Sequence, residues 1–121
     1  MTTTRSIYAT FVVAAVVGAT LVACGASGPT PGTPEALYVD LGCAKCHGEN
    51  RQGQRSGPPL VKIIDHWDEE GLIEYLKSPK TFVQSNPRLL YLDEQYPIAM
   101  PAYGTTDEKD LRKLAEFILN S

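Results

Sequence analysis

The sequence predicts an all-α protein, a single small domain of three or more helices. No stretch alternates apolar and polar side chains over the length of a strand. Near the C-terminus, in contrast, apolar residues recur at helical spacing, at Leu111, Leu114, Ala115 and Ile118. The length of 121 residues leaves room for one domain. A domain of this size buries little surface and often needs a cofactor to complete its core.

Residues 1–23 are predicted to be a lipoprotein signal peptide. Arg5 precedes an apolar run from Ile7 to Ala23, and small residues stand just before Cys24. This junction resembles the lipobox of bacterial lipoproteins, in which the cysteine is acylated and becomes the first residue of the mature protein. An uncleaved membrane anchor is the alternative, because the run is close to the shortest that spans a bilayer. Both interpretations place the remaining chain outside the cytoplasm, in the periplasm or a similar compartment, tied to a membrane.

Residues 24–33 are predicted to be a flexible linker that follows the lipidated Cys24. Gly25 to Thr33 contains glycine, proline, serine and threonine but no large apolar residue, so it cannot belong to a core. The linker would let the domain pivot above the lipid surface.

The charge of the chain argues against nucleic acid as a partner. The formal net charge is −3, and removal of Arg5 with the leader makes it −4. A nucleic-acid backbone requires a positive protein surface. No nucleic-acid partner is therefore expected.

A first helix is predicted to begin at Pro34, with Thr33 as its N-cap. Proline is tolerated in the first helical position, and threonine is a good capping residue. Gly42 should then relax the chain just before Cys43. Residues 48–64 begin with the glycines and prolines of a loop.

A second helix is predicted over residues 68–77 and is expected to end at Pro79. Its inward-facing residues are Leu72, Ile73 and Leu76. Residues 80–104 contain three further prolines and are predicted to be irregular, with a short helix near residues 89–92.

The last helix is predicted to begin at a capping box. Thr105 and Glu108 have the spacing at which each side chain satisfies a backbone N–H near the other. The apolar face that follows them is expected to pack against the core.

Residues 43–47 carry the most informative motif, Cys-Ala-Lys-Cys-His. Two thiols separated by two residues can form thioether bonds to one haem, and His47 then becomes an axial ligand of the iron. A structural zinc site needs four ligands, and only His66 remains besides the lipobox cysteine. A redox dithiol would want a βαβ context, and a disulfide between Cys43 and Cys46 would leave His47 unexplained. The predicted cofactor is therefore one covalently bound haem c.

Met100 is the predicted second axial ligand. It is the one methionine left after the leader, and Pro97 and Pro101 stiffen the chain around it. A rigid loop can hold a weak thioether ligand on iron, which raises the reduction potential. His66 is the alternative and would give bis-histidine iron. Its acidic surroundings are more typical of a surface or haem-edge residue.

These features together resemble class I monohaem cytochromes c. The resemblance extends over about residues 34–120, and the predicted cytochrome c domain spans residues 34–121. Four elements occur in the family's order: Tyr38 in a helix before the Cys43–Gly48 motif, the turn Gly57-Pro58-Pro59-Leu60, the pair Met100-Pro101, and a last helix with Leu114 and Phe117.

The resemblance implies roles for two residues of the turn. The Pro58 carbonyl would accept a hydrogen bond from His47, and Leu60 would pack on the haem ring. Where the family often has a glycine at the crossing of its terminal helices, four residues before Tyr38, this chain has Pro34. The crossing is therefore expected to be shifted or looser.

The expected function is that of a single-electron carrier, not an enzyme. A haem with both axial positions filled by protein has no open site, so no small-molecule substrate is expected. The expected partners are redox proteins at the membrane, in a respiratory or other membrane electron-transfer chain. Two alternatives stay open: a subunit permanently docked on an oxidase or reductase complex, and a peroxidase-like haem enzyme if Met100 does not bind iron.

Charged residues around the motif allow two interpretations. Basic residues lie close to the haem attachment, and acidic residues follow them. Together they could steer a partner by complementary potential, or they could simply be solvated. The basic residues are Lys45, Arg51, Arg55 and Lys62, and the acidic ones are Asp65, Asp68, Glu69, Glu70 and Glu74.

Overall fold

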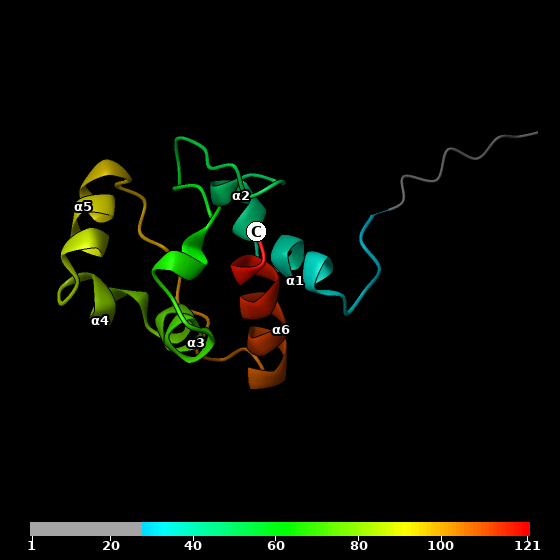
Figure 1. Ribbon diagram of the computed structural model, residues 1–121. Helices are drawn as coiled ribbons and strands as arrows, with labels where there is room; N and C mark the ends of the chain where they lie inside the picture. The colour runs from blue at the N-terminus through cyan, green and yellow to red at the C-terminus, as the bar shows by residue number, and fades with distance from the viewer. Residues whose placement is uncertain (1–27) are drawn as a thin grey trace, which may run out of the picture.

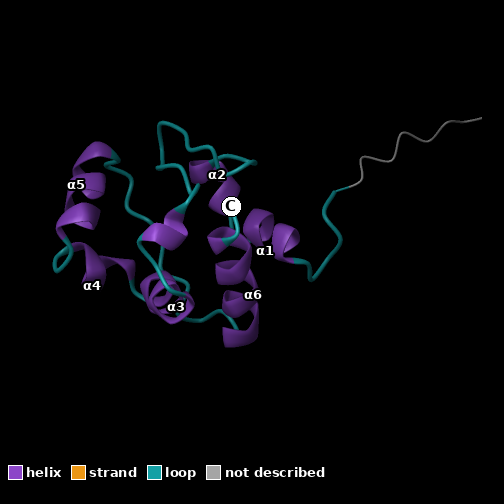
Figure 2. Cartoon of the chain, in the orientation of Figure 1, coloured by secondary structure: helices purple, strands orange, loops and turns teal. Residues whose placement is uncertain are grey.

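The computed structural model describes residues 28–121. The predicted signal peptide and Cys24 lie outside these residues, so their assignment stays a prediction. The described part of the chain contains helices but no strand, with one isolated β-bridge between Gln54 and Gly57. In chain order the elements are α1 (Pro34–Asp40), α2 (Cys43–His47), the 3-10 helix η1 (Ile63–Asp65), α3 (Glu69–Lys77), α4 (Pro79–Val83), α5 (Pro87–Gln95) and α6 (Glu108–Leu119). The predicted all-α fold is confirmed (Figure 2).

Helix α6 forms the centre of the core, because it packs on both α1 and α3 (Figure 1). The apolar face predicted for this helix is buried: Leu111, Leu114 and Ala115 have no exposed surface, and Ile118 has 3%. Helices α4 and α5 extend from the end of α3, away from α1. The core is therefore built by the two terminal helices together with α3.

Helix α1 begins as predicted and crosses α6 through aromatic contacts. The Thr33 hydroxyl accepts a hydrogen bond from the Ala36 N–H, and Pro34 takes the first helical position. The Tyr38 ring meets Phe117 edge-on, with 5.9 Å between ring centroids. The two terminal helices, α1 and α6, therefore pack together although Pro34 stands where the family often has glycine.

Pro79 does not simply stop helix α3. The Asp68 carboxylate caps the start of α3, and the helix ends with Ser78 as its C-cap. Pro79 then occupies the first position of α4, where its missing N–H costs nothing. The same residue type therefore opens a new helix directly after the old one.

The prediction of irregular chain over residues 80–104 is wrong for its first half. Residues 87–95 form α5, which is longer than the short helix expected near residues 89–92. The Asn86 side chain accepts hydrogen bonds from the N–H groups of Arg88 and Leu89, and Pro87 takes the first helical position. Residues 97–107 form no helix.

The predicted capping box at Thr105 is also wrong. Asp107 is the N-cap of α6, and its carboxylate accepts a hydrogen bond from the Lys109 N–H at 2.9 Å. Thr105 lies in a turn before the helix.

No helix among residues 28–121 is long and apolar enough to cross a membrane.

Candidate functional site

Helix α2 carries Cys43, Cys46 and His47 on one face. A separation of three or four residues places side chains one above the other on a helix. Cys43 and His47 are buried and Cys46 is half-buried. Gly42, with φ of +79°, adopts the left-handed conformation that turns the chain sharply from α1 into α2. The single turn at Gly42 thereby places all three side chains beside the core.

The imidazole of His47 is held by the backbone of the following loop. Its Nδ1 lies 2.7 Å from the carbonyl oxygen of Pro58 and donates a hydrogen bond to it in the Nδ1–H tautomer. Nε2 then remains as the free nitrogen. Burial lowers the pKa of His47, and the bond to Pro58 offsets part of this shift. A neutral imidazole is the form that binds a metal ion.

The loop reaches His47 because Gly57 approaches α2 closely. A Cβ added at Gly57 would lie 2.8 Å from the carbonyl oxygen of Cys46, so only glycine fits there without a shift. The next residue is Pro58, whose carbonyl meets His47. Gly57 therefore allows the loop to approach α2, and Pro58 supplies the carbonyl that binds His47.

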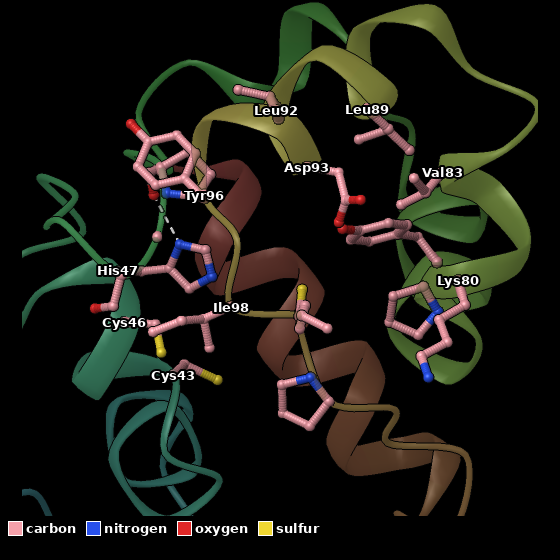
Figure 3. A pocket seen from close by; sticks show the side chains of 18 of the residues that line it. Cys43, Cys46, His47, Lys80, Val83, Leu89, Leu92, Asp93, Tyr96 and Ile98 are labelled. Carbon is pink, nitrogen blue, oxygen red and sulfur yellow. Dashed lines mark hydrogen bonds between the residues drawn. The ribbon is translucent and has the colours of Figure 1, made fainter.

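The four side chains predicted to form bonds to the haem or its iron line one cavity. Its volume is about 700 Å³, and its walls include Cys43, Cys46, His47 and Met100. Figure 3 shows Cys46 and His47 on one side of the cavity, with Leu89, Val83 and Lys80 across from them. A cavity of this volume lies in the range of roughly 300–1,000 Å³ that is typical of small-molecule and cofactor sites.

A second cavity, of about 280 Å³, shares residues with the first. Cys43, His47, Pro58 and Met100 line both. The smaller cavity adds Leu60, which also packs against the core. Pro58 and Leu60, the two turn residues singled out in the sequence, thus lie at the same site as His47.

His66 occupies a more exposed position than Met100. It follows η1 and lines only the smaller cavity, whereas half-buried Met100 lines both. The side chain of Met100 also packs against the core. Of the two candidate ligands, Met100 is better placed to meet a group held by α2.

The residues present fit a covalently bound haem. The thiols of Cys43 and Cys46 are not joined to each other, so both are available. Burial raises the pKa of the Cys43 thiol, whereas reactive dithiol centres have lowered thiol pKa values. Much of the cavity lining is apolar, as a porphyrin face requires, and it includes Val83, Leu89, Leu92 and Ile98.

Only some of the basic residues near the attachment motif lie at the site. Lys45 lines the larger cavity and Lys62 the smaller one, and Lys80 adds a cation that the sequence did not suggest. Arg51 instead stacks on Phe117 of α6, with its guanidinium carbon 4.1 Å from the ring centroid. In the acidic segment, Glu69 and Glu70 both pair with Arg112 at 2.7 Å.

The sequence did not identify the cavity wall formed by residues 83–99. Leu89 and Leu92 are separated by one helical turn and face the cavity from α5, while Tyr96 and Ile98 follow the helix. The signal that could have found this wall is the Asn86-Pro87 start followed by leucines three residues apart.

Comparison with known proteins identifies a family. A family model described as "Cytochrome c" matches residues 35–121. A comparison with curated proteins gave no match, and neither did a comparison with solved structures.

Proposed function

Because this chain belongs to the cytochrome c family, we propose that it is a single-electron carrier with one haem c. In this proposal Cys43 and Cys46 bind the haem covalently, and His47 and Met100 are the axial ligands of its iron. The proposal is carried by one observation: Met100, far away in the sequence, lines the same cavity as Cys43, Cys46 and His47. The family and the Cys-x-x-Cys-His motif together imply covalent haem c.

The protein's own residues orient the ligands and exclude water. The Pro58 carbonyl holds the His47 ring in one orientation and leaves Nε2 free, which is how ligating histidines are usually fixed. The apolar side chains of α4 and α5 keep the cavity wall dry. When bound, the haem supplies one-electron chemistry through the Fe(II) and Fe(III) states.

Proteins of this family are typically electron carriers rather than enzymes, and the family implies redox proteins as partners. With both axial positions taken by side chains, no position remains for a substrate. Lys45 and Lys80 at the larger cavity would favour a partner with an acidic surface.

We propose that the domain is tethered to the outer face of a membrane through lipidated Cys24. The support is the junction of an apolar run, small residues and cysteine at the end of residues 1–23. Residues 28–32 are exposed, and α1 begins at Pro34, which agrees with a linker before the domain. A tether would keep the haem close to membrane complexes.

A permanently docked subunit is the second candidate, and exposed apolar side chains favour it. Ile64 in η1 and Tyr91 on α5, neither of which lines a cavity, are 61% and 60% exposed. Exposed apolar side chains of this kind often mark a protein contact. Co-purification with a membrane complex would distinguish this candidate from a free carrier.

Optical spectra of the haem-loaded protein test the proposal. We expect a c-type spectrum when reduced and, when oxidised, the weak far-red band of methionine sulfur bound to Fe(III). Met100→Ala should lose the band and keep the covalent haem, because only the axial ligand is removed. His66→Ala is the matched control and should retain the band.

Three outcomes would contradict the proposal. Absence of covalent haem would rule out the cytochrome itself. A high-spin oxidised spectrum in the wild-type protein would instead indicate an open iron and favour a haem enzyme. A low-spin oxidised protein without the band, which becomes high-spin in His66→Ala but not in Met100→Ala, would assign the axial position to His66.

A further inference from the structure

Met100 lies in a segment that is poorly fastened to the rest of the domain. Among the described residues, 97–102 make no backbone or side-chain hydrogen bond. The last hydrogen-bonded residue before this segment is Tyr96, whose N–H donates to the Leu92 carbonyl at the end of α5. The position of the Met100 sulfur therefore depends on the residues that hold the two ends of this segment.

Tyr103 fastens the C-terminal end of this segment at two points. Its N–H donates to the Leu76 carbonyl of α3 at 2.9 Å. Its hydroxyl donates to the carbonyl of Leu41 at 3.1 Å. Leu41 is the C-cap of α1 and lies just before Gly42 and the helix that carries His47.

The side chain of Tyr103 also lies in the wall of the larger cavity, together with Leu41, Cys43 and Met100. Its hydroxyl donates to the Leu41 carbonyl, which would remain as the acceptor when Cys43 forms a thioether bond.

We infer that Tyr103 is the positioning residue for Met100 and holds the methionine segment against the corner between α1 and α2. This inference rests on the proposed ligation by Met100. Tyr103 restricts the free segment to residues 97–102, which limits the conformations available when the sulfur leaves the iron. Loss of the hydroxyl would leave only the Tyr103 N–H to hold this end of the segment, which would make an external ligand a better competitor.

Competition with imidazole tests this role on the oxidised, haem-loaded protein. Imidazole displaces a methionine ligand, and the far-red band reports the displacement. Tyr103→Phe removes one oxygen atom and should strengthen apparent imidazole binding by roughly two- to tenfold, the range set by the net strength of one hydrogen bond.

Tyr38→Phe is the matched control. Its hydroxyl is also buried and donates to a backbone carbonyl, that of Gly48 at 2.7 Å, but it does not touch the methionine segment. This variant should lose stability in urea and bind imidazole as the wild type does. Equal imidazole affinities for the wild type and Tyr103→Phe would overturn the inference.

A second measurement needs no variant. When imidazole displaces Met100 in the wild-type protein, the Tyr103 amide should stay protected from hydrogen exchange, because the movement ends before it. Loss of that protection in step with the far-red band would show that Tyr103 is not the fixed end. A wild-type protein without the band would refute both the ligation by Met100 and the inference that depends on it. If the band is present and Tyr103→Phe binds imidazole like the wild type, only the role of Tyr103 is refuted.

Discussion

Individual residues next to the cavity owe their identity to specific close contacts. Gly57 leaves no room for a side chain against Cys46, and Pro58 presents its carbonyl to His47. The Tyr38 hydroxyl binds the carbonyl of Gly48, the C-cap of α2, and so links α1 to the end of α2. The turn at Gly57 and Pro58 therefore orients His47, whereas Tyr38 holds one helix against the other.

The buried hydroxyl of Tyr38 makes the stability dependent on alkaline pH. Burial is the largest cause that raises its pKa, from an ordinary value of 10.0 to about 12. The unfolded chain then loses this proton first, so the group lowers the free energy of unfolding as pH rises from about 10 to about 12. Below a pH of about 10, both states hold the proton, so the full contribution of Tyr38 to stability is present and does not vary with pH.

Comparison of the wild type with Tyr38→Phe isolates this contribution, since phenylalanine has no proton to lose. We expect the urea midpoint of the variant to be lower at pH 8 and to fall less steeply between pH values of about 10 and 12. Parallel slopes for the two proteins across this interval would show that Tyr38 does not ionise differently in the two states.

The helical elements are determined mainly by their first residues. Threonine, aspartate and asparagine side chains cap α1, α3 and α5, and proline occupies a first-turn position in α1, α4 and α5. In α6 the cap is Asp107, and the acidic residues Glu108 and Asp110 follow in the first turn. Negative charge at this end also interacts favourably with the helix dipole.

Removal of the α6 cap gives a prediction with a matched control. Asp107→Ala should lower the free energy of unfolding by about 1 kcal/mol, because the Lys109 N–H loses its acceptor. Thr105→Ala changes the residue that the sequence suggested as the cap and should have little effect. Chemical denaturation of both variants measures this, and a larger loss in Thr105→Ala would assign the cap to that residue.

At the scale of the whole molecule, the core is continuous with the haem cavity. Cys43, Ile63, Leu72, Leu76 and Ile118 belong to the hydrophobic core and also line the smaller cavity. The haem would therefore fill space that the protein's own side chains leave open. Interiors are normally packed without voids of this size.

The chain without haem is accordingly expected to be largely unfolded. A Cys43→Ala/Cys46→Ala variant should lose most of its helical circular dichroism, because binding energy that stabilises only the folded state is absent. Met100→Ala, which keeps the thioether bonds, should retain it. Cooperative thermal unfolding of the cysteine-free variant, with native helix content, would show that the chain completes its core alone.

Elements whose signals are local could be predicted from the sequence. The start of α1 needs only Thr33 and Pro34, and the buried face of α6 needs only its own spacing. The attachment motif needs only five consecutive residues, so the cofactor could be inferred before any fold was known.

Features that depend on contacts between distant residues could be seen only in the folded structure. There, Met100 and His47 line one cavity and residues 83–99 form part of its wall. Arg51 stacks on Phe117, and Tyr103 binds the Leu41 carbonyl. Pro79 and Pro87 suggest the end of a helix when only the sequence is considered. In the structure, each occupies the first turn of a new helix, where its missing N–H needs no partner. Local patterns specify where a helix can form, whereas side chains far apart in the chain meet only through packing, which no short stretch of sequence encodes.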